Sequence, residues 1–174
     1  MTMSFAIKDG VPSMRFETHD SASMLFRSVD IDLAAYPMAR LALVYRVDDP
    51  QPTREPTREG DDHPARLFLR FLTDRDEKRA MEVIWGKRLN YKYIGGLPHL
   101  VAEAGDDRGG RWLDERIDLA AIYAEIWKNA APAHLTDIAV FCDADDTRTA
   151  QHQLLRICPA WTLVRLILSC EAGR

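Results

Sequence analysis

Few cysteines and no strong charge bias set the first limits on this 174-residue chain. Its three cysteines are Cys142, Cys158 and Cys170, and they form no CxxC pair. An odd number argues against a complete set of disulfides within the chain, which suits a reducing compartment. The formal net charge is −4 and no Lys/Arg run stands out, so the chain is not expected to bind nucleic acid.

Long apolar runs and a leader are also missing. The most apolar late stretch, Trp161 to Cys170, is interrupted by Arg165 and has about half the length needed to span a bilayer. Residues Met1 to Lys8 carry no basic leader followed by a long apolar core. We therefore expect a cytoplasmic protein with no membrane partner, built as a single domain over residues 1–174.

The common catalytic motifs do not occur. No GxGxxG opens a helix, and neither GxxxxGK[ST] nor a GxSxG nucleophile elbow is present. No HExxH motif and no Cys/His set has the spacing of a zinc site. A serine- or cysteine-nucleophile hydrolase is therefore unsupported.

Alternating apolar residues predict strands over most of the chain. Alternation with a period of two is typical of half-buried strands, and the segments between them are rich in Gly, Asp and Pro. The expected strands cover residues 13–18, 23–33 (with a register break near Ser28), 38–47, 65–72, 80–85, 99–104, 111–118 and 136–142. Many short strands separated by turns predict a mainly β protein, an antiparallel, jelly-roll-like β-sandwich.

One segment has helical spacing instead. Its apolar residues recur at i, i+3, i+4, i+7 and i+8, namely Leu119, Ile122, Tyr123, Ile126 and Trp127. Asp118 is the expected N-cap, and Pro132 prevents extension of the helix. We expect this short amphipathic helix to cover one end or face of the sandwich.

Two acidic turns at strand ends carry the most unusual chemistry. Crowded carboxylates repel each other unless a cation, an arginine or hydrogen bonds offset their charge. Asp143, Asp145 and Asp146 follow the strand 136–142 and supply the oxygen ligands that Ca²⁺ prefers. The alternative is that Asp145 and Thr147 cap a turn while Asp143 pairs with an arginine. Ca²⁺ is the one cofactor that the sequence suggests.

The second acidic turn holds Asp61, Asp62 and His63, directly before the strand 65–72. In a catalytic interpretation, His63 acts as a general base oriented by a carboxylate, or one of the two acids ligates a metal. In a structural interpretation, the acids end a loop and Arg66 pairs with an acid across the sheet. Pro64 at the strand entry favours the structural interpretation.

Two tryptophans on expected strands, Trp85 and Trp112, are candidate ligand contacts. An aromatic plane on a sheet face can stack on a sugar ring or another flat ligand. Arg66 and Arg116 are the candidate polar anchors beside them. Core packing is the alternative role for both tryptophans.

Several motifs occur in a characteristic order along the chain. Gly60–Leu69 holds a Gly-Asp-Asp turn followed by Ala-Arg and an apolar strand, Arg111–Arg116 reads Arg-Trp-Leu-Asp-Glu-Arg, and Ile138–Thr147 ends in Asp-x-Asp-Asp-Thr. Together they resemble the bacterial family of unknown function number 3047 (DUF3047) over about residues 13–157. The resemblance implies a jelly-roll β-sandwich related in shape to carbohydrate-binding modules. The segment 158–174 does not follow the family pattern.

Three functional hypotheses follow. The first is a binding protein for a small polar or sugar-like (glycan-like) ligand. The second is a small-molecule enzyme of acid–base, isomerase, cyclase or lyase type, with a pocket lined by Asp, His and Arg. The third is a structural module that forms a homodimer through the apolar C-terminal segment 158–174.

Overall fold

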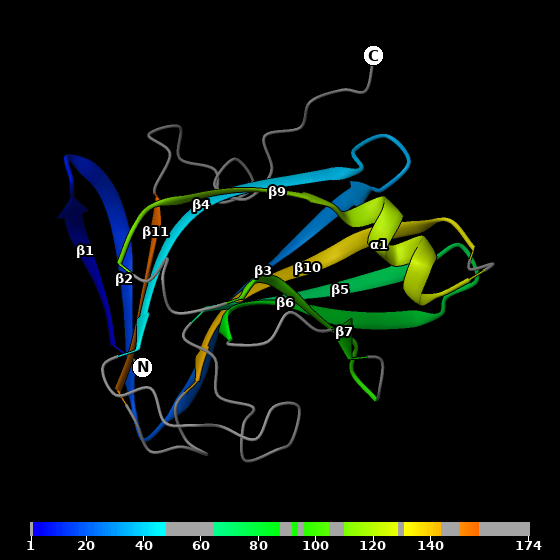
Figure 1. Ribbon diagram of the computed structural model, residues 1–174. Helices are drawn as coiled ribbons and strands as arrows, with labels where there is room; N and C mark the ends of the chain where they lie inside the picture. The colour runs from blue at the N-terminus through cyan, green and yellow to red at the C-terminus, as the bar shows by residue number, and fades with distance from the viewer. Residues whose placement is uncertain are drawn as a thin grey trace.

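The computed structural model describes residues 2–47, 65–87, 92–93, 96–104, 110–128, 131–143 and 150–156. These residues form two sheets packed face to face and one helix at one end of them (Figure 1). The elements are β1 (Thr2–Lys8), β2 (Val11–His19), β3 (Ala22–Asp32), β4 (Met38–Val47), β5 (Ala65–Thr73), β6 (Lys78–Lys87), β7 (Lys92–Tyr93), β8 (His99–Ala104), β9 (Leu113–Asp118), α1 (Leu119–Ile126), β10 (Ala133–Asp143) and β11 (Ala150–Arg156). The expected mainly β sandwich with one short helix is confirmed.

The five-stranded sheet has the order β1-β2-β11-β4-β9, and all its neighbouring strands are antiparallel. A tight hairpin joins β1 to β2 through Asp9 and Gly10, whose φ angles are 53° and 77°. Positive φ at both central residues matches the twist of the flanking strands, and Asp-Gly is a preferred pair for such a turn. The first strand is therefore held to the sheet by local sequence chemistry.

The six-stranded sheet has the order β3-β10-β5-β6-β8-β7. Its neighbours are antiparallel, with the exception of β6 and β8, which run parallel. The register of β10 against β3 shifts between Leu135 and Asp137, which lie opposite Ile31 and Ser28. This irregularity confirms the register break expected near Ser28.

The core lies between the two sheets. Leu69, Phe71, Met81 and Val83 of the six-stranded sheet are fully buried there, opposite residues such as Phe16 from the other sheet. Burial of each such side chain stabilises the fold by about 1.5–3 kcal/mol relative to its exposure to water. The side chains that alternate with them on β5 and β6 point to the outer face, away from the five-stranded sheet.

The helix α1 forms as expected, with Asp118 as its N-cap. The Asp118 carboxylate accepts a hydrogen bond from the Ala121 backbone N–H at 2.9 Å. Leu119 and Tyr123 bury one face of the helix, and the Tyr123 ring lies 5.2 Å from the ring of Phe71. Figure 1 shows α1 lying at one end of the two sheets. No helix in the described part of the chain has the length and apolar character needed to cross a membrane.

Three described strands were not expected from the sequence: β1, β7 and β11. Several of the expected strands also extend beyond their predicted bounds, as in β6, which begins at Lys78 and ends at Lys87. The segment 158–174, expected to depart from the family pattern, lies outside the described residues.

Candidate functional site

A cluster of ionisable side chains lies on the outer face of the six-stranded sheet. Ala65 and Leu67 of β5 point into the core. Arg66 lies between them in the strand, so its side chain points to the outer face. Arg66 is nevertheless only 5% exposed. A buried charge on the outer face of a sheet requires an explanation, because a charged group loses its hydration there.

The partners of Arg66 come from the next two strands of the sheet, β6 and β8. Arg66 Nη1 lies 3.3 Å from Glu82 Oε2, and the same oxygen lies 2.8 Å from Nε2 of His99. The His99 contact is within ion-pair distance, although its angles do not meet hydrogen-bond geometry. Arg66, Glu82 and His99 are called the ionic cluster below.

Strand pairing places the ionic cluster. Glu82 on β6 is in register with His99 on β8, and the Glu82 backbone N–H donates to the carbonyl of Pro98 at 2.9 Å. Arg66 is in register with Ile84 on β6 and with Phe141 on β10. These pairings bring together side chains that are far apart in the sequence.

Several described side chains around the ionic cluster are apolar. The Arg66 guanidinium carbon lies 4.7 Å from the centre of the Phe141 ring, within the range of a cation–π contact. Ile84, Ala139 and Val101, which alternate with core residues on their strands, are 0%, 1% and 4% exposed. Charges in such a layer interact more strongly than charges in water because the local dielectric constant is lower.

The strand ends next to this cluster adjoin both acidic turns. β5 begins where β10 ends, since Arg66 lies opposite Phe141. Asp61, Asp62, His63, Asp145 and Asp146 lie outside the described residues, and so does the side chain of Asp143, the last residue of β10. Among the described residues, no group of three His, Cys, Asp or Glu side chains is arranged to hold a metal ion.

The two candidate tryptophans have different environments. Trp85 is 1% exposed and belongs to the core, the position that the core-packing alternative predicts. Any ligand contact of its ring would come from inside the sandwich. Trp112 is half-buried, and its indole N–H donates to the carbonyl of Lys8 at 3.3 Å.

Arg116 is exposed on β9, in the five-stranded sheet. Leu113 and Ile117 of β9 face the core, and Arg116 alternates with them. Its side chain therefore points away from the six-stranded sheet. Arg66 and Arg116 therefore lie on opposite outer faces of the sandwich. The structure does not gather the four predicted ligand contacts at one place.

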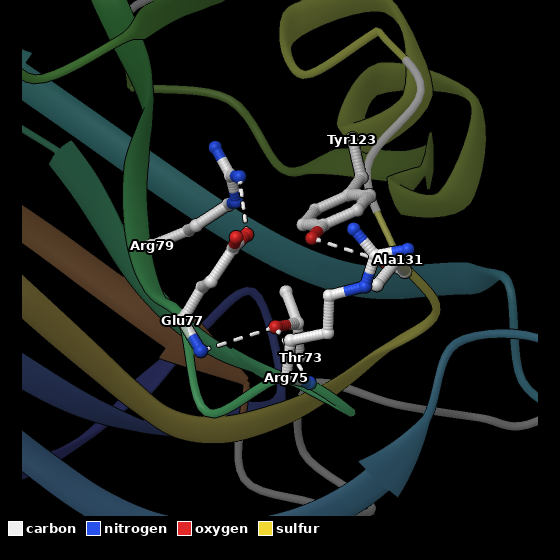
Figure 2. Close-up of polar contacts among 6 residues, drawn as sticks. All are labelled: Thr73, Arg75, Glu77, Arg79, Tyr123 and Ala131. Atoms are coloured by element: carbon white, nitrogen blue, oxygen red, sulfur yellow. Dashed lines mark hydrogen bonds and ion pairs between the residues drawn. The ribbon is translucent and has the colours of Figure 1, made fainter.

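A second group of polar residues, at the turn between β5 and β6, lies beside Tyr123 of α1 (Figure 2). Glu77 Oε2 lies 2.6 Å from Arg79 Nη2, and the Arg79 guanidinium carbon lies 5.6 Å from the centre of the Trp127 ring. The Tyr123 hydroxyl donates to the carbonyl of Ala131 at 3.5 Å, the upper limit for such a bond. Burial raises the pKa of Tyr123, Arg79 lowers it and Glu77 raises it, so the hydroxyl stays protonated at neutral pH.

An apolar recess of about 310 Å³ lies beside α1. Its lining residues are Leu33, Ala34, Ala120, Tyr123, Ala124, Trp127, Ala131, Pro132 and Ala133. The recess exists because several of its lining side chains are small alanines, and few polar atoms face it. The recess therefore offers few hydrogen-bonding groups.

Another histidine on the outer face, His134 of β10, differs from His99. It is exposed, and its Nδ1 lies 2.7 Å from Asp30 Oδ1. The hydrogen bond to Asp30 holds the pKa of His134 above its usual value of 6.5. His134 is a useful reference because it shares the sheet face and the residue type of His99 but lacks its burial.

Glu82 and His99 were missed by sequence reasoning. A usable signal was present, because Glu82 interrupts the apolar run Met81–Trp85, whose other members are all buried. A charged residue within such a run is a candidate for a paired or functional role. His99 carried no comparable signal, since its meaning depends on which strand lies beside it.

The fold and the cluster together define a β-sandwich with a buried ionic cluster on one outer face. The chain belongs to the family described as protein of unknown function (DUF3047), whose sequence profile matches residues 2–155. The family resemblance is thus confirmed and extends to β1. No match to this chain is found among curated proteins.

Proposed function

We propose that the protein binds a small polar, sugar-like ligand at the ionic cluster. The observation that carries this proposal is the burial of two paired charges, Arg66 at 5% and Glu82 at 4% exposure, beside His99 at 13%. Apolar residues of similar volume often stabilise a fold as well as a buried ion pair or better. The presence of such a cluster therefore supports a role other than stability.

The chemistry of the cluster suits a ligand with several hydroxyl groups. The Glu82 carboxylate accepts hydrogen bonds, the Arg66 guanidinium donates them in a fixed planar pattern, and the imidazole of His99 does either. Phe141 adds an aromatic edge or face for the C–H groups of a sugar ring. His99 is the most exposed member of the cluster, so the ligand would approach from its side.

The test is a screen of monosaccharides and polyols by ligand-observed NMR. With a binding sugar in hand, His99→Gln should weaken its affinity at least tenfold because a hydrogen-bonding group at the entrance is displaced. His134→Gln is the matched control, since it changes an exposed histidine on the same sheet face, and it should leave affinity unchanged. Equal affinities for the two variants, or no binding sugar in the screen, would reject this site.

Ca²⁺ is proposed as a second ligand, held by Asp143, Asp145 and Asp146. The supporting observation is that β10 ends beside the start of β5, which adjoins the other acidic turn. A cation that binds only the folded state raises apparent stability, by about 2.7 kcal/mol at a hundredfold excess over Kd. Thermal unfolding after EDTA treatment should shift upward when Ca²⁺ is added, and Asp145→Asn/Asp146→Asn should abolish the shift. An unchanged unfolding temperature in the unmodified chain would exclude the cation.

An enzyme is the second candidate function, favoured by the 2.8 Å contact between His99 and Glu82. A carboxylate beside an imidazole is the arrangement of an oriented general base. Asp61, Asp62 and His63 remain candidate catalytic residues of this hypothesis. The same NMR samples distinguish the two functions, since new product signals appear over hours only if the bound compound is converted.

A further inference from the structure

Strand β1 presents an uncovered apolar row. Met3, Phe5 and Ile7 are 50%, 83% and 77% exposed. They alternate along the strand and therefore share one face. They lie opposite Phe16, Met14 and Pro12 of β2, and Phe16 belongs to the core. The row thus continues the core-facing surface of the five-stranded sheet past the end of the core.

The row also lies at a sheet edge. β1 is the last strand of the five-stranded sheet, and no described strand pairs with its outer side (Figure 1, dark blue). Proteins usually protect such edges with charges, prolines, bulges or very short strands. Seven residues of β1 contain one charge, Lys8, and no proline. An exposed apolar edge of this length is a ready template for another strand.

We propose that a second copy of this chain covers β1, by antiparallel pairing of the two β1 strands about a two-fold axis at Phe5. In this register Phe5 faces Phe5 of the second copy, and Met3 faces Ile7. Every apolar side chain of the row then has an apolar partner across the axis, which is favourable for cross-strand pairs. Lys8 faces Thr2 of the second copy, so the two lysines, the only charged residues of the paired strands, do not lie opposite each other. The two five-stranded sheets join into one continuous sheet.

The pairing satisfies the backbone groups of two edges at once. An aromatic side chain of this kind buries roughly 150–250 Å² when covered, and a stable interface buries about 800 Å² per partner. Phe5 with Met3 and Ile7 supplies a substantial part of that area, and the strand backbones and their neighbours on β2 supply more. A symmetric apolar match is a property of this strand with itself, so a second copy fits better than an unrelated peptide.

Light scattering after size exclusion tests the proposal. The chain has a mass of 19.8 kDa, and the unmodified protein should elute with twice that mass. Phe5→Glu should weaken dimerisation at least tenfold, because it sets two carboxylates opposite each other. Its own fold should persist, since the Phe5 side chain is largely exposed. Phe26→Glu is the matched control, because Phe26 is a 65% exposed aromatic residue on β3, and its variant should remain dimeric.

A second variant identifies the register. Phe5→Cys, with Cys158 and Cys170 replaced by serine, should form a disulfide-linked dimer under mild oxidation, while Phe26→Cys in the same background should not. A monomeric unmodified chain at about 100 µM would overturn the proposal. A dimer that survives Phe5→Glu would also overturn it and would favour a dimer formed through residues 158–174. A monomeric mass with an added peptide bound would point to a peptide partner and would equally reject self-pairing.

Discussion

Replacing Glu82 with alanine should lower the free energy of unfolding by about 3–5 kcal/mol. The substitution leaves the Arg66 guanidinium in an apolar layer, 5% exposed, without the carboxylate that lies 3.3 Å from it. Removal of one member of a buried ion pair is strongly destabilising, because the remaining charge loses an interaction that offset the cost of its burial. Urea unfolding followed by fluorescence of the tryptophans measures the change.

The matched control is Glu77→Ala. Glu77 also pairs with an arginine, Arg79, at 2.6 Å, but its side chain is 46% exposed. The Arg79 side chain is 26% exposed, against 5% for Arg66, so water still reaches part of its guanidinium and the cost should stay below about 1 kcal/mol. Similar costs for Glu77→Ala and Glu82→Ala would contradict the burial on which the ionic cluster rests.

A double substitution separates stability from function. Arg66→Met with Glu82→Leu removes both charges and fills similar volume, so most of the stability lost in Glu82→Ala should return. If sugar binding is lost while stability returns, the cluster is retained for binding. If the double variant recovers neither the stability nor the sugar binding, the cluster has a structural role instead.

The fold was predictable from residue patterns that act locally. Alternation in the segment that became β2 reports that Met14 and Phe16 face the core, and Asp118 before an apolar helical face marks the start of α1. The start of the chain shows an overlooked local signal. Asp9 and Gly10 follow an alternating apolar stretch, which is among the strongest short-range indications of a hairpin. The strands β7 and β11 had weaker signals: β7 has only two residues, and in β11 the polar residues Gln-His-Gln follow Ala150.

The candidate site was predictable only in part, because it depends on strand order. Arg66 attracted attention through its place beside an acidic turn, and the structural interpretation expected an acid across the sheet. That acid is Glu82, on the neighbouring strand β6. His99 joins the pair because β8 lies parallel to β6, a pairing that connects segments by a crossover and leaves no local trace. The two tryptophans also show that strand prediction alone does not give burial. Both were expected on strands, but Trp85 is buried in the core and Trp112 is only half-buried.

Trp85→Ala should also cost about 3–5 kcal/mol of unfolding free energy, because it leaves a large cavity in the core between the sheets. Trp112→Ala should cost about 1–2 kcal/mol, since that side chain is half-buried and loses one hydrogen bond to Lys8. Thermal or urea unfolding of both variants measures the difference. A smaller loss for Trp85 than for Trp112 would contradict the core position of Trp85.

Trp85→Phe separates packing from hydrogen bonding at the same position. The Trp85 indole N–H is buried and has no acceptor among the described residues. Phenylalanine removes that donor together with part of the ring, so the desolvation cost of the donor offsets some of the lost packing. We expect Trp85→Phe to cost less than half as much as Trp85→Ala. A cost for Trp85→Phe as large as that for Trp85→Ala would contradict this expectation.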